Sequence, residues 1–221
     1  MVTVRALLAR GNSKLGSAIH HFDLPAVRTC PGRSSVCEAV CYATRNRFRT
    51  DPARERLHWC LRRSRRADFA DRVVDEVRQK GALVVRLHVS GDFYDAEYAR
   101  KWLSAIRRCR ATTFYFYTRS WRVSEIEPVL AELAGLENVV GWYSADADTG
   151  VPECVPPGVR IAWLQGDADE PVAGDLVFRD RPLRAVPPSK VALPLVCPSE
   201  TPAGRRAQTN CGNCGHCWKR Q

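Results

Sequence analysis

Strand-like and helix-like segments alternate through the middle of the chain, and this alternation constrains the fold most. Residues 82–89 (ALVVRLHV) are rich in β-branched residues, as a buried strand requires. The next segment places apolar residues at helical spacing on one face: Ala99, Trp102, Leu103 and Ile106. Asp95 stands directly before it, and an aspartate at that position caps free backbone N–H groups. The pattern predicts a strand followed by a helix that begins after Asp95.

The same alternation continues toward the C-terminus. Ser124 and Glu127 form a capping-box pattern for a second helix, which Gly135 closes. The predicted strands after the first are residues 113–117, 139–143, 159–164, 176–178 and 191–196. Short loops between strands and helices favour a parallel sheet with right-handed crossovers.

This pattern predicts an α/β fold. No glycine-rich phosphate loop follows any strand, so a (βα)-repeat barrel of the TIM type, complete or partial, fits better than a doubly wound sheet. We expect one barrel-like domain over residues 1–221. Residues 30–80 then form a helical insertion rich in arginine and cysteine, and residues 187–221 form a cysteine-bearing tail.

Polar triplets follow four of the predicted strands: SGD (90–92), TRS (118–120), SAD (144–146) and QGD (165–167). In βα folds this end of the sheet is where sites are built, so the triplets predict a shared pocket. The candidate catalytic residues at this rim are Asp92, Arg119 and Asp146. Ordinary turn chemistry is the alternative, because Ser, Gly and Asp favour turns.

Ten cysteines in a chain of 221 residues need an explanation. No apolar run approaches the ~20 residues of a membrane span, and the N-terminus lacks the continuous apolar segment of a signal peptide. We therefore expect a cytoplasmic protein without membrane contact. In that reducing compartment, cysteines indicate metal or cluster ligation rather than disulfides.

The C-terminal motif combines Cys197-Pro198 with Cys211, Cys214 and Cys217 in CGNCGHCW. This set of CxxCxxC and Cys-Pro segments matches how ferredoxin-type [4Fe-4S] clusters are held, with the order of the segments changed. Zinc is the main alternative, although zinc ribbons usually use two separated CxxC knuckles.

A second set contains Cys30-Pro31, Cys37 and Cys41. Cys37 and Cys41 are one helical turn apart, so both thiols can point the same way. Cys60, water, another side chain or a substrate could supply a fourth ligand. The two cysteine sets therefore predict one or two iron–sulfur clusters. The spacing is not the CxxxCxxC of radical S-adenosylmethionine enzymes, because Thr44 stands at the third position.

Charge is unevenly distributed in a chain whose formal net charge is +10. Residues 45–66 contain nine arginines and two acidic residues, a local balance of +7. Such a stretch, interleaved with Phe48 and Trp59, suits phosphate contacts and base stacking. It predicts DNA or RNA as a partner, through Arg62, Arg63, Arg65 and Arg66.

Several of these segments together resemble one family. They are GNSKLG (11–16), FDLPAVRTCPG (22–32), CEAVCYA (37–43), RLHVSGDF (86–93), FYTRSW (116–121) and the tail with its Cys-Pro and CxxCxxCW motifs. The chain resembles the actinobacterial and phage family known as gene product eighty-eight. The resemblance implies a phage or prophage protein that carries iron–sulfur clusters on a barrel-like α/β scaffold. The cluster positions it implies are Cys30, Cys37, Cys41, Cys197, Cys211, Cys214 and Cys217.

Three functions remain open at this point. The first is an iron–sulfur protein that responds to redox state or oxygen and binds nucleic acid. The second is a redox enzyme resembling radical S-adenosylmethionine barrels, with Asp92, Arg119 and Asp146 beside a cluster. The third is an interaction module stabilised by zinc. No specific reaction follows from the sequence.

Overall fold

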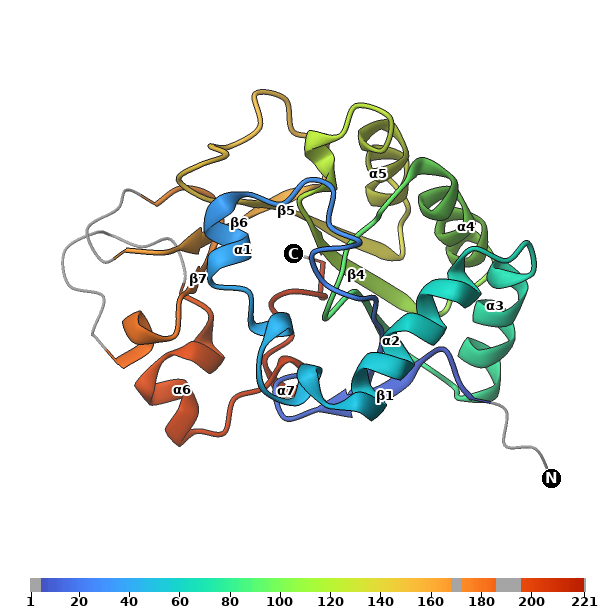
Figure 1. The fold of residues 1–221 in the computed structure, drawn as a ribbon, viewed down its shortest axis with the longest axis horizontal. Coiled ribbons are helices and arrows are strands. Elements are labelled where there is room, and N and C mark those ends of the chain that lie inside the picture. The colour runs from blue at the N-terminus through green and yellow to red at the C-terminus, as the bar shows by residue number, and fades with distance from the viewer. Residues whose placement is uncertain (1–4, 168–171, 186–195, 221) are drawn as a thin grey trace.

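The computed structural model describes residues 5–167, 172–185 and 196–220 of the chain. Its centre is a seven-stranded sheet in which each strand pairs with the next along the chain (Figure 1). The first two strands are antiparallel, and all later pairs are parallel. The strands are β1 (Ala9–Asn12), β2 (Gly16–Phe22), β3 (Val84–Leu87), β4 (Thr113–Thr118), β5 (Val139–Ala145), β6 (Arg160–Gln165) and β7 (Leu176–Arg179).

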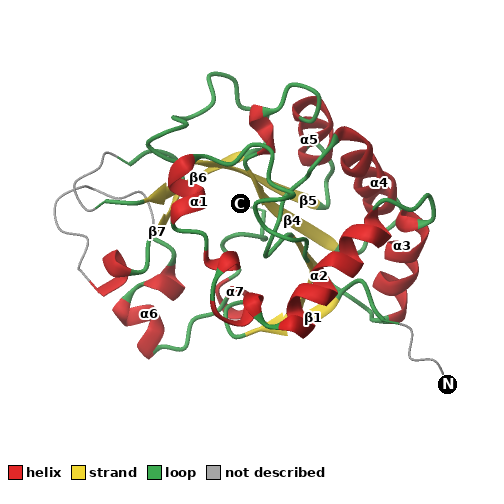
Figure 2. Ribbon diagram, viewed as in Figure 1, coloured by secondary structure: helices red, strands yellow, loops and turns green. Residues whose placement is uncertain are grey.

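The helices divide into two groups. In Figures 1 and 2, α3, α4 and α5 lie in a row along one side of the sheet, while α1, α6 and α7 lie toward the middle and the other side of the view. The helices are α1 (Ser35–Ala39), α2 (Asp51–Ser64), α3 (Phe69–Gln79), α4 (Ala96–Arg107), α5 (Glu127–Ala134), α6 (Pro202–Arg206) and α7 (Cys211–Cys214). No helix in the described ranges is long and apolar enough to cross a membrane.

Alternation along the strands gives the sheet two apolar faces. On one face, strand residues such as Phe114 and Phe116 pack with residues of the covering helices, among them Trp102. On the other face, neighbouring strand positions such as Tyr115 and Trp142 form a second cluster. That second cluster includes Cys197 and Cys217 of the tail, so the cysteine-rich tail covers the sheet face opposite the helices.

The structure confirms most of the predicted middle of the chain. Asp95 caps α4 by accepting the backbone N–H of Tyr98 at 2.7 Å. The predicted apolar face of that helix is buried. The strand predicted over residues 82–89 is shorter, because His88 has a φ of 62° and leaves the strand ladder.

One expectation is corrected, and two strands were not predicted. The capping box of Ser124 and Glu127 is absent: Ile126 and Glu127 both donate to the carbonyl of Val123, so a turn delays the start of α5 to Glu127. The sequence also gave no prediction of β1 and β2, whose polar residues interrupt the alternation expected of a strand. In the described residues the seven strands form an open sheet, whose strand order runs from β1 to β7. Most of the strand predicted at 191–196 lies outside the described residues; Val196 makes a parallel bridge to Val177.

The flanking segments follow the prediction in outline. Within residues 30–80, α1, α2 and α3 are helical. The described part of the tail contains the short helices α6 and α7 between irregular stretches.

Candidate metal centre

The CGNCGHC segment folds into one tight turn of helix followed by a reversal. Asn210 caps α7 by accepting the N–H groups of Gly212 and Asn213 at 3.0 and 3.1 Å, and Asn213 returns a bond to the Asn210 N–H. Gly215 ends the helix with a φ of 76°, a conformation that side chains with a Cβ disfavour. The reversal at Gly215 places Cys217 beside the cysteines of the helix.

Backbone hydrogen bonds tie this turn to the sheet. The N–H groups of Cys211 and Gly212 donate to the carbonyls of Lys14 and Leu15 in the β1–β2 turn, at 2.8 and 3.0 Å. From the sheet, the indole N–H of Trp142 donates to the carbonyl of Cys217 at 2.9 Å. The tail is therefore held at three backbone positions next to the cysteines.

Glu200 anchors the Cys197 segment in the same way. Its carboxylate is 2% exposed and accepts the Arg179 N–H at 2.9 Å. It also pairs with Lys14 at 3.0 Å and Arg184 at 2.9 Å. One buried carboxylate thus links the loop after Cys197 to β7 and to the β1–β2 turn.

The four tail cysteines line one pocket. Cys197 comes from one segment, and Cys211, Cys214 and Cys217 come from the CxxCxxC turn, with Ser199 and His216 beside them. Cys197 and Cys217 are buried, and the other two are partly exposed. The structure therefore brings together the four residues that the sequence assigned to one C-terminal site.

Positive side chains near this pocket partly offset the effect of burial on its thiols. Burial raises the pKa of the Cys217 thiol to about 12 and also raises the pKa of Cys211, while the positive charges of Arg86 and Lys14 act on Cys211 in the opposite direction. Arg160 lies over the ring of Trp142 at 4.0 Å. Cationic side chains on the tail-covered face can thus compensate thiolates that burial alone would disfavour.

The three N-terminal cysteines also lie close enough to affect one another. Burial, the negative charge of Asp92, and Cys37 and Cys41 together raise the pKa of Cys30 to about 12. Cys30 precedes α1, Cys37 lies on it, and Cys41 follows it. Gly32 is necessary here, because a Cβ at that position would lie 1.9 Å from the carbonyl oxygen of Arg119. The Cys30 loop therefore packs directly on the end of β4.

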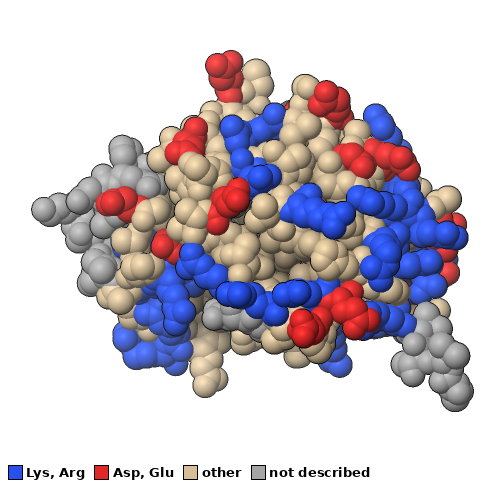
Figure 3. Space-filling model, viewed as in Figure 1, with Lys and Arg blue, Asp and Glu red and all other residues tan. Residues whose placement is uncertain are grey.

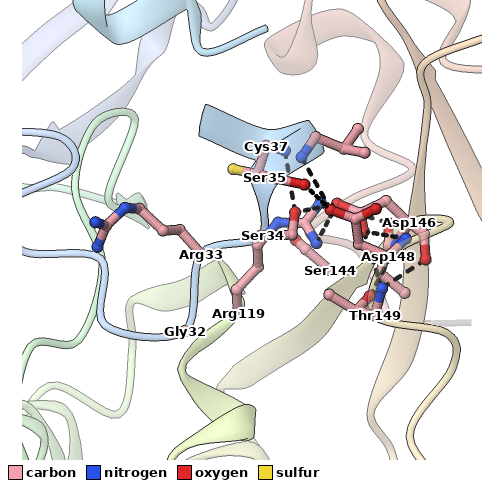
Figure 4. A network of polar contacts seen from close by, with 12 residues as sticks. Gly32, Arg33, Ser34, Ser35, Cys37, Arg119, Ser144, Asp146, Asp148 and Thr149 are labelled. Carbon is pink, nitrogen blue, oxygen red and sulfur yellow. Dashed lines mark hydrogen bonds and ion pairs between the residues drawn. The ribbon is translucent and has the colours of Figure 1, made fainter. Parts of the chain in front are cut away.

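A buried polar network supports this second set (Figure 4). Ser34 caps α1 by accepting the Cys37 N–H at 3.0 Å, and its hydroxyl donates to Asp146 at 2.5 Å. Asp146 is fully buried and pairs with Arg119 at 2.8 Å. The Arg119 charge opposes the rise that burial causes in the pKa of Cys37.

Asp92 completes the strand-end network. It accepts the Thr118 hydroxyl at 2.6 Å and the Arg119 and Phe93 N–H groups at 2.8 Å each. Burial raises its pKa to about 6. The structure thus brings Asp92, Arg119 and Asp146 together at the strand ends, where a shared pocket was predicted. They meet as a buried, mutually bonded network that positions the Cys30 and Cys37 segments.

The remaining cysteines lie elsewhere. Cys60 is fully buried in the helix-side cluster, and the charged residues that influence its pKa are Arg56, Asp23, Glu76 and Arg5. The structure does not bring Cys60 to the N-terminal set. Cys109 is buried in the same cluster, and Cys154 is exposed.

No three or more Cys, His, Asp or Glu side chains within the described ranges are placed to hold one metal ion. A single tetrahedral ion needs all its ligands at about 2.0–2.3 Å. A four-iron cluster binds each thiolate through a different iron, so its ligands lie farther apart around a shared pocket.

The arginines predicted to contact nucleic acid lie at the end of α2. Arg62, Arg65 and Arg66 are exposed, and Arg63 is half-buried and pairs with Asp68 at 2.9 Å. Figure 3 shows Lys and Arg side chains gathered over the side of the molecule formed by α2 to α4.

A family model described as Gene product 88 matches residues 6–220. The chain belongs to the gene product 88 family. Two proteins similar to it are each named Gene 88 protein, one from Mycobacterium phage L5 and one from Mycobacterium phage D29. They are 30% and 29% identical to the chain over 185 residues, which is 74% of this chain and 74% of each relative. No solved structure matches the chain.

Sequence reasoning about this gene product 88 chain missed the residues that surround the cysteines. Lys14 and Arg86 lie within the GNSKLG (11–16) and RLHVSGDF (86–93) segments, and Glu200 follows Cys197-Pro198, but no local pattern assigned these three side chains to the cysteines. Arg86 lies within an otherwise apolar strand. The positive charge of Arg86 in the middle of a β-branched run was the one available indication of a nearby anionic site, because a buried cation needs a compensating group.

Proposed function

We propose that this chain is an iron–sulfur protein that holds a [4Fe-4S] cluster through Cys197, Cys211, Cys214 and Cys217. The observation that carries the proposal is the single pocket lined by all four thiols, which come from two segments of the tail. Thiolates are the ligands that such clusters use. When bound, a cluster of this kind can accept and donate single electrons.

The electrostatic surroundings support the same assignment. A cluster with four thiolate ligands is an anion, and burying an anion requires nearby positive charge. The positive charges of Lys14 and Arg86 act to lower the pKa of Cys211 and so favour its thiolate. The N–H groups of Cys211 and Gly212 donate to carbonyls of the β1–β2 turn, and the Trp142 indole N–H donates to the Cys217 carbonyl. These hydrogen bonds hold the ligands in place before any cluster is present.

Cys30, Cys37 and Cys41 are proposed as the ligands of a second cluster. The three thiols influence one another's pKa values, and the polar network of Ser34, Arg119 and Asp146 supports their segments. Both observations favour one site over three unrelated thiols. With three cysteines, one iron would remain open to another ligand. This open position is what keeps a redox enzyme as the second candidate function.

Zinc and nucleic acid complete the alternatives. A zinc-stabilised module would hold one ion, and no group of side chains in the described segments is placed for that. Nucleic-acid association through the arginines of α2 is supported by the exposure of Arg62, Arg65 and Arg66.

We further infer that the sheet is a partial (βα) barrel, which the parallel order of β2 to β7 supports.

The deciding experiment measures iron, zinc and acid-labile sulfide per chain, with the visible spectrum, on protein purified without oxygen. About eight iron and eight sulfide are expected for two [4Fe-4S] clusters, and about four for one. Zinc without sulfide would refute the proposal and leave the structural zinc module.

Serine variants then assign the ligands. Cys214→Ser should lower the iron and sulfide content by about one cluster, and Cys37→Ser should remove the other. Cys154→Ser is the matched control, because Cys154 is exposed and belongs to neither set. Equal iron content in all three variants would contradict the assignment.

A further inference from the structure

A second cavity lies outside both cysteine pockets. It has a volume of about 210 Å³ and forms between the loop before Cys30, the turn after Cys41 and the first turns of α2. Pro25 and Leu57 contribute apolar wall and are buried, and Phe48 contributes an aromatic ring. The lining of the cavity is thus partly apolar.

The lining of the cavity also contains cationic side chains. Arg49 and Arg54 line it, with His58 one turn of α2 beyond Arg54. No acidic residue is among the described residues that line it. The acid near Arg54 is Asp51, at 4.0 Å, and its side chain is 95% exposed, so the pair is weak. Within the described segments, no acidic group forms an ion pair with Arg49. The positive charge of the cavity is therefore largely uncompensated.

We propose that this cavity binds a nucleotide, with its phosphate between Arg49 and Arg54 and its base against Phe48 and Leu57. Guanidinium groups bind phosphate oxygens through paired hydrogen bonds, and aromatic rings stack on bases of any sequence. A ligand with only a charge would leave the apolar wall unused, and a purely apolar ligand would leave two arginines without a partner. The phosphate can belong to a free mononucleotide or to a residue of a single strand.

The site is distinct from the proposed clusters. None of the seven cysteines assigned to them lines the cavity, so binding does not require a cluster. Its walls nevertheless include Ala26 and Ala43, which lie in the segments that lead to Cys30 and away from Cys41. A bound nucleotide would lie against the loops that carry the three-cysteine set.

The test titrates the full-length protein with inorganic phosphate, with adenosine monophosphate and with a short single-stranded oligothymidylate, using calorimetry at low salt. Saturable binding of the mononucleotide, tighter than that of phosphate, is expected because Phe48 adds a stacking surface. Arg54→Ala and Arg49→Ala should each weaken it about tenfold or more. Phe48→Leu should reduce the mononucleotide affinity to that of phosphate.

Arg62→Ala is the matched control. It removes the same charge from the same helix, but Arg62 does not line the cavity. Affinity should change less than about twofold in this variant. Equal losses in Arg54→Ala and Arg62→Ala would show general attraction to a basic surface and overturn the proposal, as would the absence of saturable binding of all three probes. Binding of the oligonucleotide alone, lost in Arg54→Ala only, would identify a strand as the source of the phosphate.

Discussion

Replacing Glu200 by glutamine should release the cysteine-bearing tail from the sheet. The carboxylate is almost completely buried. It accepts hydrogen bonds from the Arg179 N–H and from Lys14, and it forms an ion pair with Arg184. A glutamine amide keeps one acceptor oxygen, but its NH₂ group faces donors. At least one of these bonds must be lost, and the two cations lose the negative charge that they share.

The expected cost lies between two limits. A hydrogen bond to a charged group contributes ~1.5–3 kcal/mol, and breaking a fully buried ion pair costs ~3–5 kcal/mol. Lys14 and Arg184 are 39% and 38% exposed, so both can turn toward water when the carboxylate is removed. We therefore expect a destabilisation of ~2–3 kcal/mol, near the lower limit.

Hydrogen exchange measures the loss of stability near the tail, and urea unfolding measures the loss for the whole protein. Because Glu200 holds the loop after Cys197, the amides of Cys211 and Gly212 should exchange roughly 30- to 150-fold faster in the variant, which corresponds to ~2–3 kcal/mol. Glu132→Gln serves as the control, since its pair with Arg107 is about half exposed and should contribute less than ~1 kcal/mol. If Glu200→Gln and Glu132→Gln behaved alike, the anchoring role of Glu200 would be refuted.

Three further predictions follow from buried charges and exposed arginines. Burial lowers the pKa of His88 from 6.5 to about 3, so the unfolded state binds the proton more readily than the folded state. The free energy of unfolding should therefore fall by about 1.4 kcal/mol per pH unit as the pH drops below 6.5. His88→Asn should flatten that slope in urea unfolding measured at pH 7, 6 and 5. Asp146→Asn should cost ~3–5 kcal/mol in the same assay because it leaves the Arg119 charge buried, whereas Asp148→Asn, at an exposed site, should cost less than ~1 kcal/mol. If α2 binds nucleic acid, the slope of log affinity against log salt should fall by ~0.7–0.9 for each phosphate contact removed when serine replaces Arg62, Arg63, Arg65 and Arg66.

Each of these has a contradicting result. An unchanged pH slope in His88→Asn would mean that folding does not lower the pKa of His88. Equal costs for Asp146→Asn and Asp148→Asn would show that the buried ion pair makes no net contribution. Binding that does not depend on salt would rule out phosphate contacts by these arginines.

Local spacing was enough to predict much of the middle of the chain. Asp95 before an apolar helical stripe determines where α4 begins, because a cap and its N–H partners are only three residues apart. The runs of β-branched and aromatic residues in β3 to β6 could be recognised for the same reason. The capping-box prediction for α5 failed because the turn at Val123, set by the packing after β4, moved the start of the helix.

Some contacts of the two cysteine sets also follow from local spacing, and others only from the tertiary structure. CxxCxxC spacing by itself determines that Cys211, Cys214 and Cys217 can surround one centre, since a single helical turn and a glycine reversal join them. Only the fold decides that Cys197 meets them and that Lys14 and Arg86 face them from segments more than 100 residues away. Only the fold, too, separates Cys60 from Cys30 and converts Asp92, Arg119 and Asp146 into one buried network. These contacts depend on which strand is next to which and on which face the tail covers. No local pattern contains that information, because the free energy that sets it comes from burying the two faces of the whole sheet.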